Sequence, residues 1–185
     1  MKINKLIDFG PWCFLVSSLA FIATIPLPSF KVTYGVVGII ATILIIPGTF
    51  ALKEFFENYD NGKLPLFASI FMLTGGIFIN SLYLISTIDS KNLVDPMNNT
   101  LISYSISLGN IFFVGIFLFI ISAFRRNIMK KWINWIGISG SILVIPWFGF
   151  PFVPLLLKGI GSIGFLLTLF WMVMISIKMI QVKSK

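Results

Sequence analysis

The chain of 185 residues is 57% hydrophobic and only 11% charged, less than half of the charged fraction of about 25% found in soluble domains. This composition excludes a soluble globular protein, and the 20 Phe and 5 Trp exclude a disordered chain, because disordered segments are poor in aromatic residues. The chain has no His and one Cys, which removes the commonest general base, His-held haem, internal disulfides and thiolate metal clusters. We therefore expect an integral membrane protein with no catalytic residues, no metal site and no cofactor.

Six apolar stretches are long enough to cross the hydrocarbon core of a bilayer as helices, which takes about 20 residues each. None of them alternates as a barrel strand does, and a segment that crosses lipid must satisfy its own backbone hydrogen bonds, so all six are predicted to be helices. In chain order they run over residues 9–27, 32–52, 64–88, 101–124, 132–150 and 154–177. The connections are too short to hold a further domain. Residues 1–185 are therefore predicted to form a single all-α domain, a bundle of six transmembrane helices.

The distribution of Lys and Arg predicts how this bundle is oriented. Eleven of the fourteen basic residues fall on the side of the two termini, and only Lys31, Lys91 and Lys158 fall on the other. Because basic residues accumulate in cytoplasmic loops, we expect a multi-pass protein of the cell membrane with both termini in the cytoplasm. Trp171 falls deep inside the last helix, where it is expected to pack between helices or to face lipid.

Two amides lie inside predicted membrane helices. Asn80 and Asn110 are each about 12–13 Å from the outer ends of adjacent antiparallel helices, at 1.5 Å per residue, so we expect them to meet. Ser103 and Ser107 share the helix face of Asn110 at helical spacing. Two interpretations stay open for these four residues: a hydrogen bond that joins two helices, or a polar path for a solute.

The basic residues between the fourth and fifth helices form the densest positive cluster. It consists of Arg125, Arg126, Lys130 and Lys131, and we expect it to contact anionic lipid headgroups. Nucleic-acid binding is not expected, because the basic residues are divided among short loops. Lys158 lies about one turn inside the outer membrane edge, where it either snorkels to the headgroups or binds an anionic lipid or substrate.

Residues 145–154 form a proline-rich outer rim that cannot continue a regular helix. Its aromatic residues are Trp147, Phe148, Phe150 and Phe152. The rim is either a tight apolar turn or a docking surface for a membrane partner. On the cytoplasmic side, Glu54 and Glu57 lie on one helix face, and we expect a solvated helix end there rather than a metal site.

Taken together, these features favour a non-enzymatic membrane protein that acts by binding other membrane components. An accessory, assembly, regulatory or immunity-type subunit would fit, with the bilayer and a membrane-protein partner or a second copy as its contacts. The alternative is a transporter or channel for a small neutral or lipidic solute. A water-accessible cavity that reaches Asn80 would favour transport, and a dry, close-packed core would favour binding.

Overall fold

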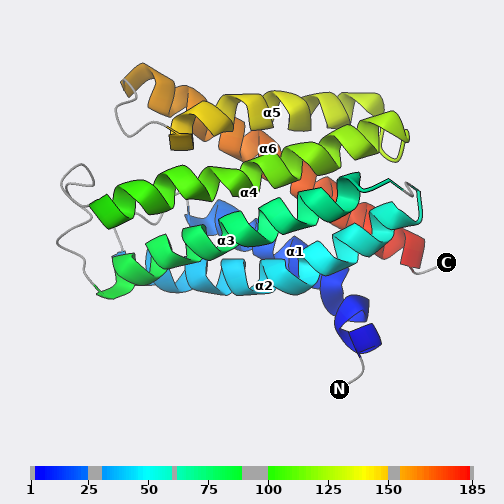
Figure 1. The fold of residues 1–185 in the computed structure, drawn as a ribbon, viewed down its shortest axis with the longest axis horizontal. Helices are drawn as coiled ribbons and strands as arrows, with labels where there is room; N and C mark the ends of the chain where they lie inside the picture. The colour runs from blue at the N-terminus through cyan, green and yellow to red at the C-terminus, as the bar shows by residue number, and fades with distance from the viewer. Residues whose placement is uncertain (1–2, 25–30, 60–61, 89–99, 150–154, 184–185) are drawn as a thin grey trace.

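The computed structural model describes residues 3–24, 31–59, 62–88, 100–149 and 155–183, which form six helices and no strand. The helices are α1 (Ile3–Thr24), α2 (Lys31–Glu57), α3 (Leu64–Ile88), α4 (Thr100–Arg125), α5 (Lys131–Gly149) and α6 (Leu155–Lys183) (Figure 1). Four of them, α2, α3, α4 and α6, contain stretches long and apolar enough to cross a membrane. The all-α class is confirmed, and the four apolar helices indicate a membrane-embedded protein.

The helices follow the predicted stretches, with one systematic difference. α3 has the predicted bounds, whereas α1 begins before the predicted start at residue 9, and α2 and α6 continue beyond the predicted ends at residues 52 and 177. The apolar pattern ends at the first charged residue, but Lys and Glu are good helix formers and the helix continues through them. In α2 the extension holds an ion pair one turn long, with Lys53 Nζ 2.7 Å from Glu57 Oε1.

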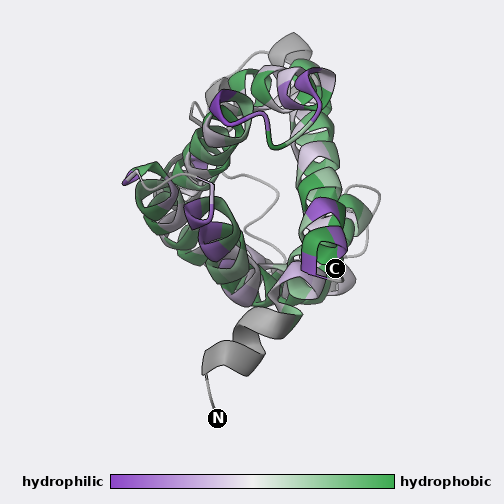
Figure 2. Cartoon of the chain, turned by 90° about the vertical axis from the view of Figure 1, so that its right-hand side faces the viewer, coloured by the Kyte–Doolittle hydropathy of each residue, from purple (hydrophilic) through white to green (hydrophobic). Residues whose placement is uncertain are grey.

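The six helices are arranged as a closed ring. Each helix packs against its neighbours in the sequence, and α6 returns to pack against α1. Viewed along the helices, the ring encloses a central region (Figure 2). Neighbouring helices run antiparallel, so α1 begins and α6 ends at the same end of the bundle (Figure 1). That end also carries the connections from α2 to α3 and from α4 to α5.

Aromatic side chains fill the middle of this ring. Phe21 of α1 lies 6.1 Å from Phe112 of α4, measured between ring centroids. Phe113, next in the chain, lies 5.9 Å from Phe165 of α6. These contacts connect opposite sides of the ring through α4. Nearer the end with the termini, Phe56 of α2 reaches across to α4. Exposed residues recur at helical spacing along α1, α2, α3, α5 and α6, whereas α4 has only buried and half-buried positions over residues 109–124.

Glycines set the distance between the two helices of each hairpin. In the α3–α4 pair, a Cβ atom added to Gly75 would lie 2.5 Å from the Cα atom of Phe112, and one added to Gly115 would lie 2.6 Å from the carbonyl oxygen of Ala68. These distances are far below normal contact, so each glycine lets one backbone touch the other. The same reciprocal arrangement occurs at Gly10 and Gly48 between α1 and α2, and at Gly140 and Gly164 between α5 and α6.

Substitution of Gly75 should therefore destabilise the bundle, while substitution of its neighbour should not. We expect Gly75→Ala to lower the free energy of unfolding by about 1–3 kcal/mol, because the new methyl group forces α3 and α4 apart. Gly76→Ala is the matched control, since its Cβ would meet only Ile45 and Phe112 side-chain atoms, at 3.8 and 4.0 Å. We expect this control to keep or raise the free energy of unfolding, by up to about 1 kcal/mol, because Ala is the better helix former. Reversible unfolding in dilute detergent micelles measures both, and equal losses in the two variants would contradict the close contact.

Candidate functional site

The polar contact at the centre of the candidate site joins α2 to α3. Thr42 Oγ1 lies 2.7 Å from Asn80 Oδ1, and Thr42 is buried while Asn80 is half-buried. Oγ1 also lies 3.0 Å from the carbonyl oxygen of Gly38 and 2.9 Å from that of Ile39. A threonine hydroxyl has one proton, so it donates to only one of these three acceptors at a time.

This arrangement allows two orientations of the Asn80 amide. In one, the Thr42 hydroxyl donates to Oδ1. In the other, the amide is turned by 180°, its Nδ2 donates to Oγ1, and the hydroxyl donates to the backbone carbonyl one turn earlier. Oxygen and nitrogen of an amide are assigned from such hydrogen-bond partners. In either orientation half of the amide stays available for another partner, because Asn80 makes no second hydrogen bond.

The contact lies at the wall of a groove between α2 and α3. The groove has a volume of about 100 Å³ and is lined by Thr42, Ile43, Ile45, Ile46, Leu73, Gly76, Ile77 and Asn80. Ile43 and Ile77 are 55% and 67% exposed, whereas Ile45 is buried. The groove therefore opens on the outside of the ring and not towards its centre. An unsatisfied polar group in lipid costs several kcal/mol, so the free half of the Asn80 amide is costly wherever lipid covers this face.

The expected contact between Asn80 and Asn110 is not made. Both amides lie at the predicted depth, but Asn80 bonds Thr42 of α2 instead. The reason is the direction of the side chains around α3. Ile79 is the residue that faces α4, where it lies against Gly109, and the next residue along a helix is turned by about 100°. Ser103 and Ser107 belong to α4, and their side chains lie outside the described residues.

The sequence interpretation missed two contact residues, Thr42 and Asn134. Thr42 lies fifteen residues before the end of α2 and Asn80 sixteen residues after the start of α3, so their matching depths on antiparallel helices were the available signal. Asn134 of α5 is buried and accepts a hydrogen bond from Trp171 Nε1 at 3.2 Å. Trp171 thus packs between α5 and α6, which was one of the two expectations for it.

The basic cluster sits on a well-defined turn between α4 and α5. Ile128 N donates to the carbonyl of Ala123 at 3.0 Å, and Asn127 N donates to that of Phe124 at 3.3 Å. Asn127 has a φ of 50°, which asparagine tolerates better than most residues. This is a Schellman termination of α4 with Asn127 in the left-handed position. It holds Arg125, Arg126, Lys130 and Lys131 exposed around one short turn.

For the remaining predicted site residues, the structure describes the helix position of some and nothing of the others. Lys158 lies in the first turns of α6, at the end of the bundle opposite to the basic cluster, but its side chain lies outside the described residues. The same holds for Trp147 and Phe148 at the end of α5, while Phe150 and Phe152 lie outside the described residues altogether. The rim is thus still a prediction from the sequence.

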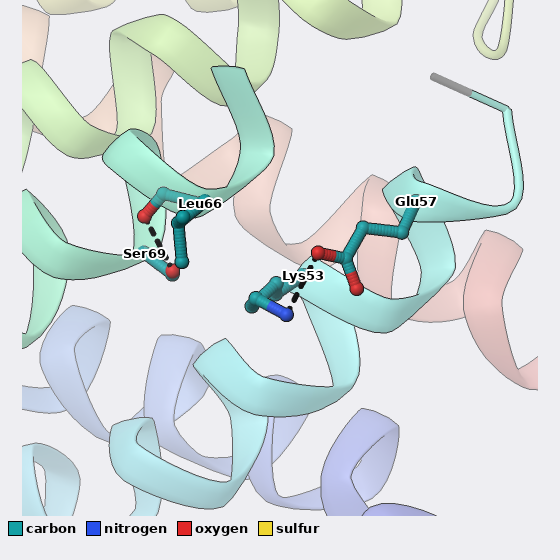
Figure 3. A network of polar contacts seen from close by, with 4 residues as sticks. All are labelled: Lys53, Glu57, Leu66 and Ser69. Carbon is teal, nitrogen blue, oxygen red and sulfur yellow. Dashed lines mark hydrogen bonds and ion pairs between the residues drawn. The ribbon is translucent and has the colours of Figure 1, made fainter. Parts of the chain in front are cut away.

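The carboxylates at the end of α2 are partly engaged. Glu57 pairs with Lys53 within α2, and across from them Ser69 of α3 donates to the carbonyl of Leu66 at 2.8 Å (Figure 3). An exposed pair of this spacing adds about 0.3–0.5 kcal/mol. Within the described ranges, no group of three or more His, Cys, Asp or Glu residues could hold a metal ion. Glu54 and Glu57 are both exposed, so this end of α2 is solvated and has an internal ion pair.

The chain matches no protein-family model, no curated protein and no solved structure.

A double-mutant cycle should detect the Thr42–Asn80 contact and distinguish it from the pairing expected from depth alone. We expect Thr42→Val and Asn80→Ala to be coupled by about 0.6–2 kcal/mol, the range for interhelical hydrogen bonds. Asn80→Ala with Asn110→Ala is the control cycle, and it should be additive within about 0.5 kcal/mol. The measurement is the free energy of unfolding in bicelles. Coupling in the control cycle alone would contradict the geometry.

Proposed function

We propose that the protein is a non-enzymatic, six-span membrane protein that acts by binding other membrane components. It would serve as an accessory, assembly, regulatory or immunity-type subunit in the cell membrane. The observation that carries this proposal is the outward position of its intramembrane polar contact. Thr42 and Asn80 line a groove between α2 and α3 whose rim residues are exposed on the outside of the ring.

The packing inside the ring supports the same function. A solute path through the middle would need polar groups that face inward. In the described part of the chain, the contacts that join α1, α4 and α6 across the ring are made by phenylalanines. The cavity that reaches Asn80 opens outward between aliphatic side chains. Several hydroxyls buried in the described helices are already engaged, because Ser18, Thr49, Thr168 and Ser176 each donate to a carbonyl of their own helix one turn earlier, which leaves them less able to line a solute path.

The charge at the two ends of the bundle supports an orientation with both termini in the cytoplasm. Described basic residues at the end with the termini are Lys5, Lys53, Lys63, Arg125, Arg126, Lys130, Lys131, Lys178 and Lys183, whereas the opposite end has Lys31 and Lys158. The positive-inside rule then places the first end in the cytoplasm. Exposed Trp132 and Trp135, beside the basic turn, mark an interface on that side.

Purification from native membranes tests the proposed function. We expect the full chain, extracted in nanodiscs under mild conditions, to retain another membrane protein in near-stoichiometric amount, identified by mass spectrometry. A photoreactive residue at Trp147 should crosslink to that protein, because the aromatic rim is the docking surface predicted from the sequence. The matched control is the same residue at Ile163, which is exposed on α6. A homogeneous particle that carries only lipid would contradict the proposal and direct attention to solute flux.

A further inference from the structure

We propose that the groove between α2 and α3 is the interface of a homodimer, in which the Asn80 amides of two copies hydrogen-bond to each other. The two copies would be related by a two-fold axis normal to the membrane. This inference deepens the proposed function by assigning an occupant to the same groove, and its test needs only the chain itself, so it can fail while the proposed function stands.

The first argument is the unsatisfied half of the Asn80 amide. Its one hydrogen bond is to Thr42, at 2.7 Å. The amide lies at the wall of a groove whose rim is exposed isoleucine, inside a stretch of α3 that is apolar enough to cross a membrane. Lipid chains offer no hydrogen-bonding groups at this depth. A polar group on another protein surface would satisfy the amide at this depth.

The second argument is complementarity. Two copies inserted with the same topology place their Asn80 residues at the same depth without further adjustment. Each amide carries both donors and an acceptor, so two amides can pair reciprocally about a two-fold axis. Nδ2 of each copy donates to Oδ1 of the other, and each Oδ1 keeps the hydrogen bond from the Thr42 hydroxyl of its own copy, because a carbonyl oxygen has two lone pairs.

The third argument is shape. The groove of about 100 Å³ has room for a branched aliphatic side chain, since a single water takes up about 30 Å³. Ile77, one turn before Asn80, is 67% exposed on the same face and fits this description. Around a two-fold axis, Ile77 of each copy would enter the groove of the other. The floor at Gly76 is open to it, as a Cβ there would find no atom closer than 3.8 Å.

Energy transfer between labelled copies tests the proposal with the purified full chain in phosphatidylcholine–phosphatidylglycerol vesicles. Cys13, the single cysteine, is replaced (Cys13→Ser), and Lys63→Cys at the exposed start of α3 carries donor or acceptor dye. We expect transfer that falls reversibly as lipid dilutes the protein, as for a dimer. Asn80→Leu should lower the dimerisation constant by about 3- to 30-fold, the range for one interhelical hydrogen bond.

The Thr42→Val variant distinguishes a loss of the dimer interface from a loss of folding stability. It breaks the same intrachain hydrogen bond but leaves the Asn80 amide in place, so we expect the dimer to persist. If Thr42→Val weakens transfer as much as Asn80→Leu does, the effect comes from the fold and the proposal is wrong. An Asn80→Leu variant with an unchanged dimerisation constant overturns it as well, as does a chain that remains monomeric at all protein-to-lipid ratios.

Disulfide trapping then locates the interface. In the Cys13→Ser background, we expect Ile77→Cys to form an oxidant-dependent dimer. Ile142→Cys on α5 is the matched control, because Ile142 is also an exposed isoleucine, at 56%, but lies on a different face of the ring. Equal trapping at the two positions, or trapping at Ile142 alone, would contradict an interface on α2 and α3. Because no other protein is present in these vesicles, failure here leaves the proposed function to its own test.

Discussion

The rest of the structure depends on backbone contact between the two helices of each hairpin. A pair of glycines in each, such as Gly75 and Gly115 between α3 and α4, brings the main chains together. In lipid there is no hydrophobic force to press apolar helices onto each other, so van der Waals contact over a close approach must hold them. Three such hairpins, each tightly joined, are then linked by α2 with α3, α4 with α5 and α1 with α6. The contact of α1 with α6 then closes the ring.

The two helices of each hairpin approach closely at small residues, so bulky side chains are needed to fill the centre of the ring, and the chain has them there. Phe14, Phe56, Phe113, Phe119 and Trp171 are among its largest fully buried residues, and rings from α1, α4 and α6 contact each other across the middle. Aromatic pairs at these centroid distances also add attraction beyond the area they bury. Small residues between the two helices of a hairpin and large residues at the centre of the ring therefore act together to give a close-packed bundle.

Much of the fold could be predicted from the sequence, and less of the site. Length and hydropathy located all six helices, because a run of about 20 apolar residues leaves the backbone little choice in lipid. Helix ends were less certain where charged residues continue the helix, as at Lys53 and Glu57. For the site, depth along a helix could be counted, and this is why Asn80 and Asn110 were expected to meet. Rotation about the helix axis was harder to predict, because a polar face such as that of Asn110, Ser103 and Ser107 does not show which neighbouring helix it faces. Thr42 was missed for this reason, although its depth matches that of Asn80.

The Thr42–Asn80 contact also links the packing of the ring to its outer surface. Thr42 lies one turn after Gly38, whose Cα is so close to Tyr83 of α3 that no side chain would fit there. The hydroxyl that orients the amide is thus held at the point where α2 and α3 are pressed together. The packing of α2 against α3 therefore sets the depth and direction of the amide, while the amide itself carries the donors and the acceptor that remain for a partner.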